Sequence, residues 1–130
     1  IVAARFDEPY PDFNPNIQVR MFGYTAGRPR DIRVIADTQL QLLARLARNA
    51  APVAPAELVE LDGLQVAHAK LQATLKTQEG ELPFISEGWF IPKAEFYLIV
   101  SIGYRPDGLT GTRDAAAAAV QSMKIFRDEL

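Results

Sequence analysis

Few side chains in this sequence could carry catalytic or metal-binding chemistry. Its 130 residues contain no Cys and one His, His68. Disulfides, thiolate catalysis and zinc sites with Cys ligands are therefore excluded, and a single imidazole cannot supply a multi-histidine metal site. We expect no metal site and no cofactor.

Two side chains are candidates for catalysis. His68 alternates with apolar residues beside Lys70, with no acidic residue close in sequence, which predicts a solvent-facing histidine and not a general base. Ser101 lacks the first glycine of a nucleophile elbow and lies in an apolar strand, which predicts a packed core serine. We therefore expect no catalytic residue and no enzyme. The alternative is a small enzyme that pairs His68 with an acid distant in sequence, and it requires a carboxylate within hydrogen-bond distance of His68.

Five residues are candidates for contacts with a partner. Tyr10 and Phe13 lie in a loop stiffened by proline, where they could meet a partner or fold back over the end of the sheet. Arg28 and Arg30 precede a predicted helix, where an anionic group would be favoured, although the favoured interpretation is a solvated helical face. Trp89 could line a partner surface or pack in the core.

Composition excludes further classes. The chain is 48% hydrophobic and 23% charged, which is typical of a globular domain. A net charge of −2 gives no broad positive field for nucleic acid, so we expect no nucleic-acid partner. No apolar run approaches the ~20 residues of a membrane-spanning helix, so we expect membrane association only through an anchor upstream of Ile1, if there is one. The length predicts one domain over residues 1–130.

The pattern of elements predicts the fold class. Strands are expected over residues 1–6, 17–24, 57–61, 64–75, 82–91 and 95–104, and helices over 31–50, capped by Asp31, and 115–123, capped by Thr112. Asp62-Gly63 is a type I′ hairpin signal, Pro92 suits a second tight turn, and residues 51–55 form a connector. We expect one face of the strand over 64–75 to be wet, and the strand over 96–102 to be central and covered on both faces. The order predicts an α+β domain with a mostly antiparallel sheet and two helices packed on it.

Four segments in this order and spacing resemble the PsbP and Mog1-like domains. They are the entry to a strand over residues 14–19, the amphipathic helix over 31–50, the turn over 57–64 that leads into a long strand, and the closing hairpin with its helix ending at 121–126. The resemblance implies an α/β/α sandwich and roles in protein binding, assembly or chaperoning, with no shared enzymatic activity and no site residues to carry over. The strand that usually begins this family, and any leader, would lie upstream of Ile1.

These observations predict a non-catalytic binding or assembly module that holds a protein partner or a small apolar ligand between sheet and helix. The family that the chain resembles includes small bacterial lipoproteins. The resemblance therefore implies that the module lies in the periplasm or elsewhere outside the cytoplasm. The alternatives are a cytosolic chaperone or adaptor of the same fold, and the small enzyme that uses His68. The sequence does not predict the oligomeric state.

Overall fold

The computed structural model describes residues 2–5, 16–46, 50–77, 80–106 and 110–125. In chain order its elements are β1 (Val2–Arg5), β2 (Asn16–Gly23), α1 (Ile32–Leu46), β3 (Ala51–Pro52), β4 (Glu57–Leu61), β5 (Leu64–Thr77), β6 (Gly80–Pro92), β7 (Phe96–Tyr104) and α2 (Thr110–Gln121). Neither helix is long and apolar enough, over its described residues, to cross a membrane.

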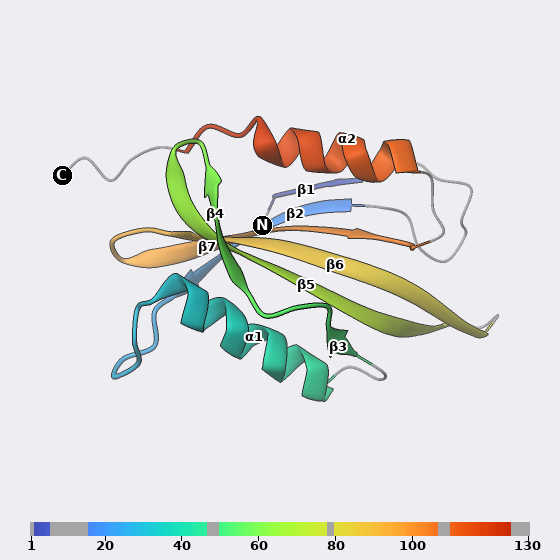
Figure 1. Cartoon of the computed structure of the whole chain (residues 1–130), viewed down its shortest axis with the longest axis horizontal. Coiled ribbons are helices and arrows are strands. Elements are labelled where there is room, and N and C mark those ends of the chain that lie inside the picture. The colour runs from blue at the N-terminus through green and yellow to red at the C-terminus, as the bar shows by residue number, and fades with distance from the viewer. Residues whose placement is uncertain (1, 6–15, 47–49, 78–79, 107–109, 126–130) are drawn as a thin grey trace.

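The strands form one sheet between two helices. The sheet has seven strands in the order β1-β2-β7-β6-β5-β3, with β4 also paired to β5. All of these pairs are antiparallel. The two helices lie on opposite faces of the sheet, α2 above it and α1 below it in Figure 1. The predicted α+β fold, a mostly antiparallel sheet with two helices packed on it, is confirmed.

The β4–β5 hairpin shows how the sequence sets the register. Asp62 and Gly63 adopt φ angles of 50° and 76°, which a type I′ turn requires and which Gly tolerates without strain. The Asp62 carboxylate also accepts a hydrogen bond of 2.7 Å from the backbone N–H of Ile125. One turn residue therefore closes the hairpin and ties down the segment that follows α2.

The α2 side of the sheet carries the larger apolar core. Ala116 and Val120, four residues apart on α2, face the sheet on one side of the helix. The short Ala116 side chain lets the helix approach the strands closely. The buried members of this core are Leu61, Val66, Trp89, Ile91, Val100, Ile102, Tyr104, Ala116, Val120 and Ile125.

A smaller core lies under α1. Ile32, Ala36 and Leu40 recur every four residues and form a single buried stripe on the helix. The stripe packs mainly on β5 and extends to β3 and β6. The sheet residues of this core are Ala67, Ala69, Leu71 and Phe90.

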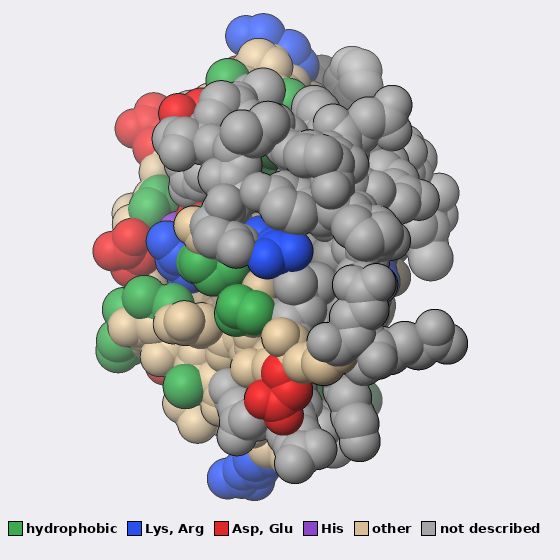
Figure 2. Space-filling model, turned by 90° about the vertical axis from the view of Figure 1, so that its right-hand side faces the viewer, with side chains coloured by type: hydrophobic (Ala, Val, Ile, Leu, Met, Phe, Trp, Pro, Cys, Tyr) green, Lys and Arg blue, Asp and Glu red, His purple; other side chains and the backbone are tan. Residues whose placement is uncertain are grey.

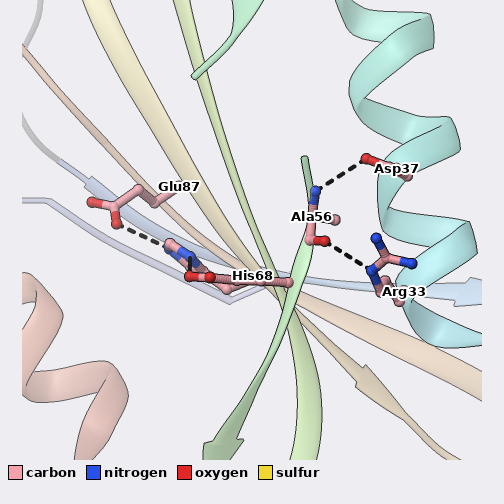
Figure 3. A network of polar contacts seen from close by, with 6 residues as sticks. Arg33, Asp37, Ala56, His68 and Glu87 are labelled. Atoms are coloured by element: carbon pink, nitrogen blue, oxygen red, sulfur yellow. Dashed lines mark hydrogen bonds and ion pairs between the residues drawn. The ribbon is translucent and has the colours of Figure 1, made fainter. Parts of the chain in front are cut away.

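Polar contacts at the start of α1 fix its position. The Asp31 carboxylate accepts hydrogen bonds from the backbone N–H groups of Arg33 and Val34, which confirms the predicted cap. One turn on, the Asp37 carboxylate accepts from the Ala56 N–H at 3.0 Å, and Arg33 Nε donates to the Ala56 carbonyl at 3.1 Å (Figure 3). Ala56 is 2% exposed, so both backbone groups that bond to α1 belong to a buried residue. We call these two bonds the Ala56 clasp.

The structure corrects several predicted boundaries. Helix α1 ends at Leu46 and not near Ala50, and the predicted connector contains the short strand β3. Proline is tolerated in β3 because it lies at the edge of the sheet. Thr112 lies inside α2, which already begins at Thr110, and therefore does not cap it.

The turn between β6 and β7 also lies two residues later than predicted, over residues 93–96 and not 91–94. Pro92 is the last residue of β6, paired with Tyr97, and the turn is closed by a 2.9 Å hydrogen bond from the Lys93 N–H to the Phe96 carbonyl. The fixed φ of proline is compatible with an extended strand end as well as with a turn, so its presence alone did not locate the turn.

The two hydrogen bonds of the clasp should contribute to the stability of the fold. We expect Asp37→Ala to lower the free energy of unfolding by about 1–3 kcal/mol, because it leaves the buried Ala56 N–H without its acceptor. Chemical denaturation followed by circular dichroism measures the loss. The matched control is Thr38→Ala at the exposed next position of the helix, and equal stability of the two variants would contradict the role of the clasp.

Candidate functional site

Helix α1 leaves part of its face of the sheet open. A helix about 10 Å wide covers only about two strands spaced about 4.8 Å apart, and the clasp holds α1 over β5. On β7 the residues that face this side, Tyr97, Ile99, Ser101 and Gly103, are only half-buried, whereas Val100, Ile102 and Tyr104 on the α2 side are buried. The prediction that this strand is covered on both faces is therefore wrong for the α1 face, and so is the prediction that Ser101 is a packed core serine.

The open strip forms a groove beside the helix, which we call the α1 groove. It has a volume of about 300 Å³. Its lining comes from α1 and from strands β2, β5, β6 and β7. The lining residues are Gln18, Arg20, Phe22, Gln39, Leu40, Leu43, Ala69, Leu71, Phe84, Ser86, Gly88, Phe90, Ile99, Ser101, Ile102 and Gly103.

The floor of the groove is low because small residues lie in register across three strands, β7, β6 and β5. Gln18 of β2 pairs with Ser101, Ser101 pairs with Gly88, and Gly88 pairs with Ala69 of β5. A Cβ atom placed on Gly88 would lie 3.4 Å from the Phe90 ring, an ordinary van der Waals contact. Glycine at this position therefore keeps open a space that a side chain would partly fill.

The groove has a polar end and an apolar end. At the β2 end, Arg20 is exposed and its Nη2 donates a 2.7 Å hydrogen bond to Gln18 Oε1. Arg20 is the one charged residue among the described residues of the lining. Toward β5, by contrast, the lining is apolar and includes Leu40 and Leu43 of the helix and Leu71 of β5. Such a site can hold an apolar group and orient it by a polar group at one end.

A second hollow continues along α1 from Gln39, which lines both. It has a volume of about 380 Å³. Tyr97 lies at its edge with its ring centroid 5.5 Å from that of Tyr24, and the pKa of Tyr97 is raised by burial and, to a smaller extent, by the charge of Tyr24. The other lining residues are Thr25, Arg28, Pro29, Val34, Ile35 and Thr38.

Of the three predicted partner-binding residues that the structure describes, Trp89 lies apart from Arg28 and Arg30. Arg28 lines the second hollow, whereas the Arg30 guanidinium lies 4.8 Å from the centroid of the Tyr24 ring and donates to the Ala94 carbonyl. Trp89 is 4% exposed within the α2-side core, which favours the core-packing interpretation.

Tyr10 and Phe13 lie outside the described residues.

Exposed apolar side chains also occur on the surface of the molecule, and Figure 2 shows hydrophobic side chains beside Lys and Arg on one side of it. The large hydrophobic residues that are exposed are Met21, Val34, Leu42, Leu43, Val53 and Leu58.

His68 differs most from its prediction. Its Nε2 lies 3.0 Å from Glu87 Oε1, and its Nδ1 lies 3.8 Å from a carboxylate oxygen of Glu57 (Figure 3). The Tyr104 hydroxyl donates a 2.7 Å hydrogen bond to the other Glu87 oxygen. The His68 side chain is 19% exposed and its ring packs against Trp89. The prediction of a solvent-facing histidine without a partner acid is therefore wrong. The predicted wet face of β5 is exposed at Gln72 and half-buried at His68, Lys70 and Thr74.

The β5–β6 register explains why this contact was missed. His68 pairs with Trp89, so Glu87, two residues away on β6, lies on the same face of the sheet although it is 19 residues distant in sequence. Glu87 is 2% exposed, and a buried carboxylate requires hydrogen-bond donors such as these two side chains. The arrangement satisfies a buried acid in the core. Neither of the two hollows is lined by His68.

The groove residues on the sheet were also missed as a site. Gln18 and Arg20 read only as the polar positions of an alternating strand. The available signals were Gly88 in mid-strand and Ser101 within an otherwise apolar run, since small residues inside strands mark places where another group approaches the backbone. Neither signal indicates which helix lies nearby.

Comparisons with known proteins identify structures that share the fold and do not identify a function. No protein-family profile matches the chain, and no curated protein sequence matches it either. Solved structures do match. A protein of unknown function from Pseudomonas aeruginosa, PA94, suggested to be a regulator, superposes with a TM-score of 0.74 at 14% identity, over 96% of this chain and 82% of that one.

Two further structures share the fold. LpqN of Mycobacterium tuberculosis, involved in cell envelope biogenesis, has a TM-score of 0.58 at 15% identity, over 90% of this chain and 65% of that one. A protein from Bacteroides thetaiotaomicron has a TM-score of 0.51 at 16% identity, over 98% of this chain and 42% of that one. The chain therefore spans less than two thirds of both proteins. At these identities the likeness shows the α+β fold alone, and the resemblance to PsbP and Mog1-like domains stays a prediction.

The buried Glu87 carboxylate should also contribute to stability. We expect Glu87→Ala to lower the free energy of unfolding by about 2–4 kcal/mol, because it leaves a cavity and removes the acceptor of the Tyr104 hydroxyl. Glu87→Gln retains the shape and one acceptor oxygen and should lose less. Glu60→Gln at an exposed position of β4 is the control. If thermal or chemical unfolding places Glu87→Ala within about 0.5 kcal/mol of the unchanged protein, the range expected of ordinary surface substitutions, Glu87 is not a structural centre of this core.

Proposed function

We propose that this chain is a non-catalytic binding module that holds an apolar group of a ligand or assembly partner in the α1 groove. The observation that carries the proposal is the half-buried α1 face of β7, at the centre of the sheet, where an apolar strand is expected to be covered. Exposed apolar surface of this kind, next to polar groups, marks binding sites.

The dimensions and lining of the groove support a small occupant. Its volume of about 300 Å³ lies at the lower end of the range for small-molecule sites. Phe90 and Ile99 offer apolar contact surface, and the Ser101 hydroxyl and the Gln18 amide offer hydrogen bonds that fix orientation. A small ligand, or one apolar side group of a larger partner, fits this description.

We further propose that the module works outside the cytoplasm. The support is the fold shared with LpqN, a protein involved in cell envelope biogenesis. A cytosolic chaperone or adaptor that binds an apolar client segment in the same groove is the alternative, and the compartment of the full-length protein in cell fractionation distinguishes the two.

A small enzyme that uses His68 is the second candidate, favoured by one observation. The 3.0 Å contact with Glu87 meets the requirement that a carboxylate lie within hydrogen-bond distance. Against it, both ring nitrogens face carboxylates and the ring packs on Trp89, an arrangement that serves the core equally well. If a His68→Gln variant keeps both its stability and its binding in the groove, this histidine has no structural role. That result would favour the enzyme.

The binding function can be tested with the neutral dye N-phenyl-1-naphthylamine, whose fluorescence rises in apolar surroundings. We expect saturable binding, and we expect Ser101→Leu to weaken it about tenfold or more, because the larger side chain fills the floor of the groove. Ser122→Leu, the same substitution at an exposed position after α2, is the control and should bind as the unchanged protein does.

Two results would contradict the proposal. One is the absence of saturable dye binding to the unchanged protein. The other is undiminished binding to a Ser101→Leu variant whose circular dichroism and unfolding midpoint show that it is folded.

A further inference from the structure

We propose that the α1 groove selects a single-chain anionic amphiphile, with its anionic head at Arg20 and Gln18 and its apolar chain directed across the sheet toward β5. This inference rests on the proposed function and specifies the ligand class. It follows from three features of the groove: the charge at its mouth, the donors beside that charge, and the shape of its interior.

The charge at the mouth is positive and has no acidic partner in the part of the chain that the structure describes. Among the described residues, the hydrogen-bond partner of the Arg20 guanidinium is the Gln18 amide oxygen, and no Asp or Glu lines the groove. A guanidinium has five N–H donors in a fixed fork, and the bond to Gln18 uses one of them. The fork fits a carboxylate or a similar planar anion, which can accept two parallel hydrogen bonds.

The neighbouring groups also favour an acceptor. Because Gln18 Oε1 accepts from Arg20, the amide NH₂ of Gln18 is the part of that side chain that can donate to a ligand. Ser101 is the register partner of Gln18 on β7, and its hydroxyl lines the same floor. Among the described lining residues, Arg20 is the one charge that a cationic head would meet, and it would repel that head. A neutral head would lose the charge-assisted bonds.

The interior suits one apolar chain. From the β2 end, the row of Ser101, Gly88 and Ala69 leads across the sheet toward β5, and Leu40 and Leu43 lie along the helix side. The path therefore changes from polar to apolar along its length. A groove of about 300 Å³ is small for a lipid with two chains, which favours a single chain.

The test is displacement of N-phenyl-1-naphthylamine by three probes with the same ten-carbon chain: decanoate, 1-decanol and decyltrimethylammonium, each below its aggregation concentration. We expect decanoate to bind about tenfold more tightly than decanol, the ratio that one charge-assisted pair of about 1.4 kcal/mol produces, and decyltrimethylammonium to bind most weakly.

Variants assign the selectivity to one residue. Arg20→Met keeps the apolar stem and removes the charge, and it should abolish the preference for decanoate over decanol. Arg20→Lys should retain part of the preference, since it keeps the charge but loses the fork. The matched control is Arg28→Met, which removes an exposed arginine from the second hollow and should leave the preference intact.

The outcomes separate this inference from the proposed function. If the dye binds in the groove but decanoate binds no better than decanol, or if Arg20→Met keeps the preference, the ligand class is wrong and the binding function stands. If neither the dye nor any probe binds, both are wrong. Binding to phosphatidylglycerol vesicles without binding to monomeric decanoate would overturn the inference in favour of a membrane surface.

Discussion

The position of α1 is the constraint on which the candidate site depends. The Ala56 clasp joins one turn of the helix to the backbone just before β4, and the buried stripe of Ile32, Ala36 and Leu40 then lies on β5. A helix held there cannot also cover β2 and β7, because it is only about two strands wide. The groove is the part of the sheet that this helix leaves open.

Because α1 covers only part of its face, the two faces of the sheet are covered to different extents. On the α2 side, helix, hairpin and C-terminal segment close over the core, and even a buried acid, Glu87, has donors from His68 and Tyr104. On the α1 side, the central strand β7 keeps a half-exposed apolar surface with small residues in register at its floor. The first face is closed by the larger core, and the second is the face on which we propose that a ligand binds. The solved structures that share the fold show that this layered arrangement occurs elsewhere and leave the ligand open.

Local sequence signals predicted the elements of the fold well and the candidate site poorly. Asp62-Gly63 located its hairpin and Asp31 its helix cap because both act through their own backbone neighbourhood. The apolar run of β7 correctly indicated a central strand, but the sequence does not show which strands a helix will cover, so Ser101 was taken for a core residue. His68 and Glu87 meet only through the β5–β6 register, a relation between distant segments that alternation along one strand does not reveal.

The central claim, that the α1 groove holds an apolar group, is tested most directly by intermolecular nuclear Overhauser effects between N-phenyl-1-naphthylamine and the methyl groups of the protein. We predict effects to the methyl groups of Leu40, Leu43 and Ile99, which line the groove, and none to those of Leu61, Ile91 and Val120 in the opposite core. Effects confined to the second set, or to neither set while the dye is bound, would contradict it.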